Sequence, residues 1–305
     1  MKIVAVVVTY NRLTLLKRTI PAVLANPGVN TLIVVNNGST DGTSEWLRTI
    51  IPREPRLRVI TQENVGGAGG FHTGIREAET MQPDWVWCMD DDVFPRPDCL
   101  EQMLAAAAGD HSVGIISPRR LVDGKVFTTE FLSFDFSNPF ASTYQGRLSR
   151  SKTPVDTPTF ISGAAFEGLC IRTEVIHRIG LPRPDLFIFC DDTDYCYRTL
   201  LAGFRILYVP AAIMDKQPFF TDDNWAVRNV KKKWKRFYQV RNSSFLNHTY
   251  GRNAAVRHLR GFNYVAGYII TAALTAPFSR AWSYSDIPRL WRAYTDGIRH
   301  RLGKY

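Results

Sequence analysis

Residues 85–92 read Trp85-Val86-Trp87-Cys88-Met89-Asp90-Asp91-Asp92, an apolar run of strand length that ends in three adjacent carboxylates. Similar apolar runs over residues 3–8, 31–35 and 57–60 predict further buried strands. Strands that alternate with helices form an α/β fold with a mostly parallel sheet. The helices are expected between the strands, at residues 13–24, 43–50, 74–80 and 98–108.

Polar clusters follow three of these predicted strands directly. They begin at Thr9, Asn36 and Asp90. In open α/β sheets, ligands bind outside the carboxyl ends of the strands. The three clusters are therefore expected to converge on one site.

The three carboxylates Asp90, Asp91 and Asp92 predict a divalent metal site. Adjacent like charges are costly unless a cation or hydrogen-bond donors compensate them, and carboxylate oxygens are preferred ligands of Mg²⁺ and Mn²⁺. The structural alternative is a helix N-cap. One Asp would satisfy that role, which leaves the other two unexplained.

A second acidic cluster, Asp191-Asp192-Thr193-Asp194, opens another predicted helix. One of its carboxylates can cap that helix while a neighbour faces the site. The apolar residues 187–189 before it would raise the pKa of such a carboxyl group enough to make it a general base. The alternative is an ordinary capped helix start.

The glycine-rich stretch at residues 66–71 is expected to form a loop before a helix. Glycines such as Gly67 let the backbone approach a ligand closely and direct amide groups at phosphate or sugar oxygens. The spacing is not that of a dinucleotide-binding fingerprint, and an ordinary loop is the alternative.

Composition indicates a folded globular protein and excludes a disordered one. The 305 residues are 45% hydrophobic and 22% charged. Five cysteines without a CxxC pair favour neither a disulfide framework nor a zinc ribbon, so a reducing cytoplasm is expected. The N-terminal apolar run is too short for a signal peptide, which predicts no export.

Positive charge is concentrated in the last 90 residues. Residues 216–305 contain 17 Lys or Arg and 4 Asp or Glu, against a formal net charge of +10 for the whole chain. This asymmetry predicts an anionic partner, either nucleic acid or an acidic membrane surface, and a solvated basic face is the alternative.

Two segments of this tail point to a membrane surface. Residues 231–242 mix cations with aromatic rings, which suits RNA or an interfacial helix on anionic lipid. Residues 262–278 carry no charge but are interrupted by Gly267 and Pro277. They favour peripheral attachment over a membrane span, and a buried helix that closes the core is the alternative.

The remaining segments are less regular. Asp123-Gly124 is a turn signal within a predicted hairpin, and strands are expected at residues 161–171 and 205–209. Pro210 is expected to end the catalytic core. The predicted domains are residues 1–215, the α/β domain, and 216–305, a basic and mainly helical extension.

Four motifs, taken together and in order, resemble the family-2 GT-A glycosyltransferases over residues 1–215. The resemblance implies a GT-A fold and inverting, metal-dependent transfer of a sugar from a nucleotide diphosphate. Residues 63–71 and the triple Asp resemble the bacterial galactofuranosyltransferases, which use UDP-galactofuranose; rhamnosyltransferases share much of the pattern. The motifs lie at residues 7–12, 35–43, 90–92 and 191–195.

The resemblance also implies roles for individual residues. Asp92 would bind the metal and Asp192 would be the catalytic base, with Asp191 beside it. The other positions would hold the donor: Thr9, Arg12, Asn37, Asp41 and Asn64 the uridine and ribose, and Asp90 and Asp91 the ribose and donor sugar.

The chain departs from the family at one metal ligand. The family often places a metal-binding His shortly after the strand that is expected to end at Val209-Pro210, whereas this chain has Ile213-Met214-Asp215-Lys216. Either Asp215 replaces the His as an oxygen ligand, or the ion is held by Asp92, diphosphate and water only.

The expected function is therefore transfer of galactofuranose from its UDP donor to a hydroxyl of a lipid-linked bacterial cell-surface glycan such as O-antigen, with Mn²⁺ or Mg²⁺ as cofactor. The protein is expected in the cytoplasm, peripherally on the inner face of the plasma membrane. The alternatives are a rhamnosyltransferase that uses dTDP-rhamnose and a nucleic-acid-binding protein that uses the basic tail. If the protein is a galactofuranosyltransferase or a rhamnosyltransferase, no nucleic acid partner is expected.

Overall fold

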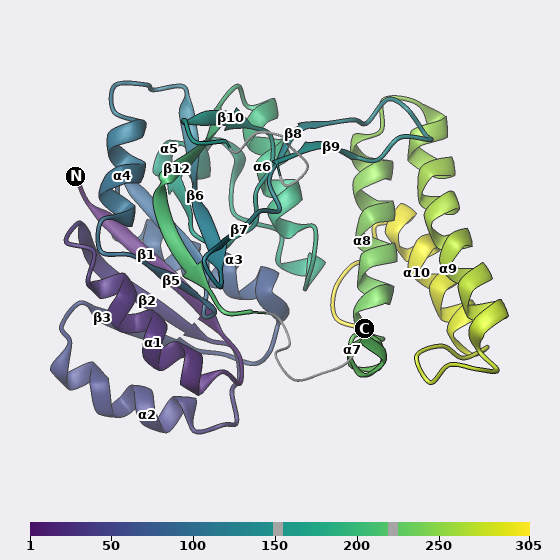
Figure 1. The fold of residues 1–305 in the computed structure, drawn as a ribbon, viewed down its shortest axis with the longest axis horizontal. Coiled ribbons are helices and arrows are strands. Elements are labelled where there is room, and N and C mark those ends of the chain that lie inside the picture. Colours follow the sequence, from purple (N-terminus) through teal and green to yellow (C-terminus); the bar gives the residue numbers. More distant parts are fainter. Residues whose placement is uncertain (149–154, 219–224) are drawn as a thin grey trace. The chain divides into compact units, whose positions relative to one another are not determined.

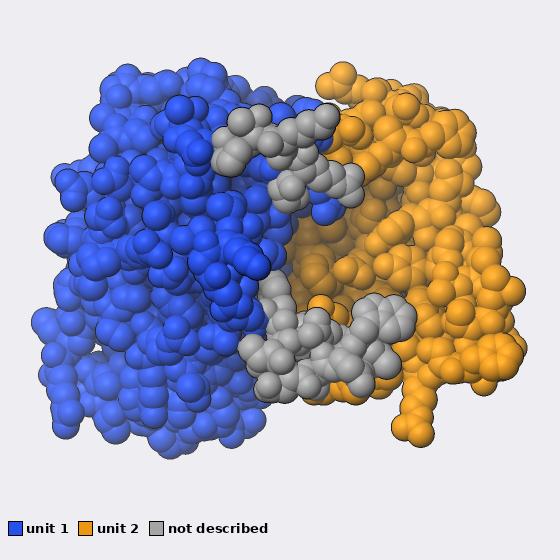
Figure 2. Space-filling model, in the orientation of Figure 1, with its two compact units in different colours: residues 1–133, 146–184, 192–218 blue, residues 134–145, 185–191, 219–305 orange. Residues whose placement is uncertain are grey.

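The computed structural model describes residues 1–148, 155–218 and 225–305 (Figure 1). The chain forms two compact units (Figure 2). The first comprises residues 1–133, 146–184 and 192–218, and the second comprises 134–145, 185–191 and 219–305. The second unit thus includes two short segments that the sequence analysis assigned to the α/β domain.

The first unit is built on one mixed sheet. Its strands run in the order β10-β12-β6-β11-β4-β1-β2-β3, with β5 beside β12 and β7 beside β6. The strands are β1 (Ile3–Thr9), β2 (Val29–Asn36), β3 (Leu57–Thr61), β4 (Trp85–Asp90), β5 (Val93–Pro95), β6 (Val113–Val122), β7 (Lys125–Phe127), β10 (Thr159–Ile161), β11 (Leu169–Arg172) and β12 (Arg205–Lys216); β8 (Phe131–Phe134) and β9 (Tyr144–Arg147) form a separate pair.

The predicted βα alternation is confirmed in the first hundred residues. β1 pairs in parallel with β2 and β4, and β2 pairs in parallel with β3. In β1 the register places Val8 beside Asp90 of β4, so the polar residues that follow these strands lie at the same edge. The helices of this unit are α1 (Leu13–Leu24), α2 (Thr43–Ile50), α3 (Gly66–Glu79), α4 (Cys99–Ala106), α5 (Thr173–Ile179) and α6 (Asp191–Leu201, of which Asp191 belongs to the second unit), with a short 3-10 turn at Ile51–Arg53. A second 3-10 turn, Pro184–Leu186, lies where the chain passes into the second unit.

Helices pack on both faces of the sheet because successive side chains of a strand point to opposite faces. Ile3, Ala5 and Val7 belong to a core formed with α1, α2 and α4. On the other face, a Cβ atom on Gly74 would lie 2.3 Å from Val6. Close contact between α3 and β1 therefore requires glycine.

The glycine-rich stretch is helical, not a loop. α3 begins at Gly66, eight residues before the expected start. A Cβ atom added to Gly69 would lie 2.5 Å from the Val65 side chain, and one added to Gly70 would lie 2.5 Å from the Val8 side chain. A Cβ atom on Gly67 would have nothing within 4 Å. Packing explains Gly69 and Gly70, whereas Gly67 has open space beside it.

The second half of the sheet differs from the prediction at two places. The expected strand at residues 161–171 is two short strands, β10 and β11, joined by a loop. β12 does not end at Pro210 but continues to Lys216 after an irregularity between Val209 and Ile213. The predicted turn is confirmed, since Asp123 and Gly124 have φ of 50° and 74° between paired β6 and β7.

The second unit is helical around its own apolar core. Phe237 and Val240 pack with Val265, Leu290 and Tyr294. Within the described residues, no helix combines the length and the apolar character that crossing a bilayer requires. Its helices are α7 (Trp225–Lys231), α8 (Lys235–Tyr250), α9 (Gly261–Thr275), preceded by a π-helical turn at Ala255–Arg260, and α10 (Asp286–Ile298).

The five cysteines are free thiols, and four of them are buried. Burial raises the pKa of Cys88, Cys99, Cys170 and Cys196 above the ordinary range of a thiol. Cys190 is the partly exposed one.

Candidate active site

The carboxyl ends of β1 and β4 bring together the predicted clusters that begin at Thr9 and Asp90. The Thr9 hydroxyl donates to Asp91 at 2.6 Å. One guanidinium nitrogen of Arg12 lies 3.1 Å from Asp91 and 3.0 Å from Asp92. Arg12 is half-exposed, so its charge also faces solvent at this edge.

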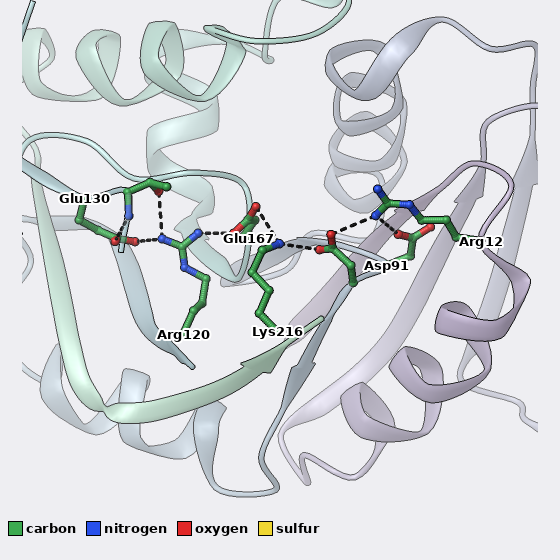
Figure 3. Close-up of polar contacts among 8 residues, drawn as sticks. Arg12, Asp91, Arg120, Glu130, Glu167 and Lys216 are labelled. Atoms are coloured by element: carbon green, nitrogen blue, oxygen red, sulfur yellow. Dashed lines mark hydrogen bonds and ion pairs between the residues drawn. The ribbon is translucent and has the colours of Figure 1, made fainter. Parts of the chain in front are cut away.

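Lys216 extends the network across the sheet (Figure 3). Its ammonium group lies 2.8 Å from Asp92 and 3.1 Å from Glu167, and its side chain is fully buried. Glu167 in turn pairs with Arg120, which also pairs with Glu130 (Figure 3). The result is a continuous row of alternating charges from Arg12 to Glu130.

Glu167 is held by the turn that follows it. Gly168 has φ of 108°, and its amide donates to the Cys88 carbonyl at 2.9 Å while its carbonyl accepts from the Trp87 indole at 3.0 Å. A Cβ atom there would lie 2.3 Å from the Met214 sulfur. Only glycine fits this position, which fixes Glu167 against the end of β4.

The charge of the network favours a divalent cation. Among its described residues, five carboxylates (Asp90, Asp91, Asp92, Glu130 and Glu167) accompany three cations (Arg12, Arg120 and Lys216). Burial, followed by the charges of Asp92 and Glu167, raises the pKa of Asp90 well above its usual range. Burial also raises the pKa of Asp91 to about 6, although Arg12 and Thr9 act in the opposite direction.

Three of these carboxylates fit a metal ion. Oxygen atoms of Asp90, Asp92 and Glu167 all lie within 4.8 Å of one another. Opposite ligands of Mg²⁺ are about 4 Å apart, so the three oxygens are close enough to share one ion beside the Lys216 ammonium group, which contacts Asp92 and Glu167. With every carboxylate counted as ionised, the network has two negative charges in excess, which equals the charge of a divalent ion.

Asp215 does not join this group. Its carboxylate pairs with Arg96 at 3.2 Å, and both side chains are about half exposed. On β12 adjacent side chains alternate, so the buried Lys216 reaches Asp92 while Asp215 points to the opposite face. This geometry gives no support to Asp215 as a replacement for the family's metal-binding His.

Replacing Asp215 by Asn is expected to leave any dependence of nucleotide binding on a divalent cation unchanged, because its carboxylate contacts Arg96 and not the network. Since the pair is exposed, the variant should lose at most about 1 kcal/mol of stability. Metal titration of nucleotide binding, together with a thermal melt, checks both statements. A higher metal requirement in the variant would place Asp215 back among the ligands.

The predicted nucleotide residues lie near the same edge in two groups. The Asn37 amide donates to the Gly66 carbonyl at 2.9 Å and lies 3.5 Å from the Asn64 oxygen. Asp41 accepts from the Leu13 amide at 2.9 Å and from the Thr43 hydroxyl at 2.5 Å. Asp41 thereby joins the starts of α1 and α2, which is a structural role that the sequence motif did not reveal.

Asp192 combines partial exposure with a raised pKa. Burial raises its pKa to about 6, while hydrogen bonds from Thr193 act in the opposite direction, and the charges of Glu167 and Arg120 also influence it. Asp192 is thus within electrostatic reach of the charged network. Asp194 is instead fully buried between Arg198, at 2.8 Å, and Arg183, at 3.4 Å, which indicates a structural role.

Four residues of this site were missed by sequence reasoning: Arg120, Glu130, Glu167 and Lys216. They lie on β6, on loops and at the end of β12, and none belongs to a run of acidic residues. The only available signal was the Arg119-Arg120 pair inside the predominantly apolar strand β6.

Comparison with known families assigns the chain. Residues 4–165, more than half of the chain, match the family described as Glycosyl transferase family 2. This chain belongs to glycosyltransferase family 2. Residues 85–294 of the transferase also match the description Glycosyl transferase family group 2, which extends into the second unit.

Curated relatives of the transferase are bacterial. It is 26% identical over 201 residues to the galactofuranosyltransferase GlfT1 of Mycolicibacterium smegmatis and 28% identical over 204 residues to GlfT1 of Mycobacterium tuberculosis. These matches cover 65% of this chain and 65% and 64% of the relatives. It is also 27% identical over 188 residues to poly-beta-1,6-N-acetyl-D-glucosamine synthase of Staphylococcus aureus, covering 60% of this chain and 41% of that protein.

Solved structures confirm the GT-A fold. GalNAc-T7 with UDP, GalNAc and Mn²⁺ superposes with a TM-score of 0.59 at 12% identity, covering 90% of this chain and 57% of that one. The mannosyltransferase PcManGT of Pyrobaculum calidifontis, in complex with GDP-Man and Mn²⁺, gives 0.55 at 15% identity, covering 98% and 88%.

Proposed function

We propose that the transferase moves galactofuranose from UDP-galactofuranose to a hydroxyl of a lipid-linked bacterial cell-surface glycan, with inversion of configuration. The observation that carries this proposal is the pairing, within one unit, of a carboxylate network suited to a divalent cation with a separate, partly exposed carboxylate, Asp192, whose pKa is raised to about 6 by desolvation. The name of the GlfT1 relatives supports the choice of donor.

In this mechanism Asp90, Asp92 and Glu167 would hold Mn²⁺ or Mg²⁺, which would supply positive charge to stabilise the departing diphosphate. Arg12 adds a second positive charge at the same edge, and Asp192 accepts the proton of the acceptor hydroxyl as the new bond forms. Attack by the hydroxyl in a single displacement inverts the anomeric carbon.

A donor screen tests the proposal. The parent protein with Mn²⁺ and a short lipid-linked glycan acceptor is supplied separately with UDP-galactofuranose, UDP-galactopyranose, UDP-N-acetylglucosamine and dTDP-rhamnose, and release of the nucleoside diphosphate is measured. Turnover confined to UDP-galactofuranose is expected. Turnover with dTDP-rhamnose alone would establish the rhamnosyltransferase alternative, and a melting temperature raised by oligonucleotides but not by UDP and Mn²⁺ would favour a nucleic-acid-binding protein.

We further propose that the second unit binds an anionic membrane surface through α9. The basic stretch at residues 231–236 is partly internal to this unit: Lys233 pairs with Asp286 at 2.8 Å, and Arg236 donates to the Ala281 carbonyl at 2.7 Å. α9 itself carries no charged residue and exposes Ile270 and Leu274.

Phe278, just beyond α9, is 90% exposed and is followed by the exposed Arg280. Large apolar side chains that remain exposed together mark interaction surfaces. An adjacent cation favours anionic lipid headgroups, by about 1 kcal/mol per charge. We therefore place α9 and residues 276–280 against the cytoplasmic leaflet of the plasma membrane.

Replacing Leu274 and Phe278 together by Ser is expected to reduce sedimentation with phosphatidylglycerol vesicles, because the variant loses two apolar side chains worth about 1.5–3 kcal/mol each when buried. Transfer to a short soluble acceptor should not change. The matched control is Leu201→Ser, an exposed Leu (64%) at the end of α6 in the first unit. Parental vesicle binding by the double variant would exclude α9 as the docking surface.

A further inference from the structure

The loop before α6 is held in an unfavourable backbone conformation. We call residues 185–190 the base loop, because they lead directly to Asp191 and Asp192 at the start of α6. Phe187, Phe189 and Cys190 have φ of 64°, 67° and 67°. Residues other than glycine rarely adopt this left-handed backbone conformation, and they keep it only where surrounding contacts hold them in it.

Asn242 of α8 fixes the base loop through its backbone. The Asn242 side-chain amide is 2.9 Å from the carbonyl oxygens of Leu186, Ile188 and Phe189, and the residue is fully buried. The contacts are within the second unit, to which the loop and α8 both belong. One side chain thus contacts three of the carbonyl groups between Leu186 and the first residue of α6.

Arg241 fixes the orientation of Asn242 and adds a second set of contacts. Its Nε donates to the Asn242 side-chain oxygen at 2.8 Å, and a terminal nitrogen donates to the Leu186 carbonyl at 3.1 Å. Its guanidinium also binds the Gly303 carbonyl and lies about 5 Å from the ring of Tyr305. Residues 303 and 305 therefore also contact Arg241.

Burial of Arg241 is costly for the second unit. Only 1% of the residue is exposed, and burial lowers its pKa. Among the described residues, no ion pair within 4.0 Å includes Arg241; carbonyl oxygens of the base loop and of residue 303 contact its guanidinium, and the charges of Asp185 and Asp296 act on it from a greater distance. A buried guanidinium held mainly by carbonyl oxygens is an expensive way to stabilise a helical unit, which indicates a requirement beyond stability.

We infer that Arg241 and Asn242 are positioning residues, which hold the base loop so that Asp192 keeps the orientation needed to accept the proton of the acceptor hydroxyl. The inference rests on the proposed function, in which Asp192 is the base. It assigns the second unit a part in the chemical step, carried through the chain from residue 190 to residue 192. A base displaced by about 1 Å loses about 10²-fold in rate.

Asn242→Ala is therefore expected to lower kcat about 100-fold while leaving the affinity for UDP and Mn²⁺ unchanged. The matched control is Asn247→Ala. Asn247 lies on the same helix and is equally buried, but its side-chain oxygen accepts from Thr143 and Arg260 and does not contact the base loop. Any effect of lost stability in α8 appears in both variants, whereas the loss of kcat should appear only in Asn242→Ala.

A double variant distinguishes positioning from a general structural effect. If Asn242 acts through Asp192, then Asp192→Asn combined with Asn242→Ala turns over no more slowly than Asp192→Asn alone. Multiplicative losses would overturn the inference. Parental kcat in Asn242→Ala, together with a lowered kcat in Asp192→Asn, would also overturn the inference but would leave the proposed function intact. Parental kcat in Asp192→Asn would refute Asp192 as the base.

Loss of UDP binding in Asn242→Ala would indicate a damaged fold. In that case the variant Arg241→Lys tests whether the two residues position the base loop. Lysine keeps the positive charge but lacks the planar fork that orients Asn242 and reaches the Leu186 carbonyl. A fall in kcat of at least tenfold, with nucleotide binding intact, supports the positioning role. Unchanged kcat in a folded Arg241→Lys overturns it.

Discussion

Replacing Asp192 by Asn is expected to lower kcat by about 10²- to 10⁴-fold, because the amide cannot accept the proton of the acceptor hydroxyl. Binding of UDP with Mn²⁺ should be unchanged, since Asp192 contributes no oxygen to the carboxylate group that fits the cation. Steady-state rates and nucleotide titrations on the same preparation measure both quantities.

The pH profile offers an independent test of this residue. Because burial raises the pKa of Asp192 to about 6, the base is ionised above that pH and is lost by protonation below it. The parental kcat should fall as the pH drops below about 6, and this dependence should disappear in Asp192→Asn. Asp194→Asn is the comparison: it removes a buried partner of Arg198 and should lower stability. A folded, UDP-competent Asp194→Asn without turnover, beside an active Asp192→Asn, would move the base to Asp194.

Replacing Asp92 by Ala is expected to abolish the Mn²⁺-dependent part of UDP binding. Asp92 is one of three carboxylates whose oxygens lie close enough to share an ion, and removal of groups that merely orient metal ligands already costs 10- to 100-fold in affinity. Calorimetric titration of UDP with and without Mn²⁺ measures the effect. Glu167→Gln should weaken the same dependence, although no motif singled out this residue.

The Asp92 variant also needs a fold control, because Asp92 pairs with the buried Lys216. Breaking a buried pair costs about 3–5 kcal/mol. Asp92→Asn keeps the shape of the side chain and some of its hydrogen bonds, and Asp215→Asn removes a neighbouring carboxylate from the exposed face. Metal dependence that persists in a folded Asp92→Asn and Asp92→Ala would show that the ion, if required, binds elsewhere.

The parallel half of the fold could be predicted from sequence because β1, β2 and β4 are mainly apolar runs, each followed by polar residues, and the shorter β3 differs in containing Arg58 and in burying only Leu57. The predicted helices at residues 13–24 and 43–50 coincide with α1 and α2. α3 was predicted too short because Gly66 to Gly70 indicate a loop locally. Tight packing of Gly70 and Gly74 on β1 overrides that preference, and only the tertiary structure shows it.

The site was predicted where carboxylates are adjacent in sequence and missed where they are isolated. The irregularity in β12 shows why. Val209 pairs with Pro118, and Ile213 pairs with the next residue, Arg119, so three extra residues shift the alternation of the strand by an odd number. This shift places Lys216 and not Asp215 beside Asp92, and no sequence pattern indicates it. Glu167 depends similarly on the turn at Gly168.

The distribution of thiols gives experimental access to the base loop. The four buried cysteines have raised pKa values and stay protonated at neutral pH, so they react slowly with maleimides or methanethiosulfonates. Cys190, partly exposed and two residues before Asp192, is the thiol that such reagents reach first. A fluorophore or spin label at this native position would report on the loop during donor and acceptor binding, in a protein that needs no engineered cysteine.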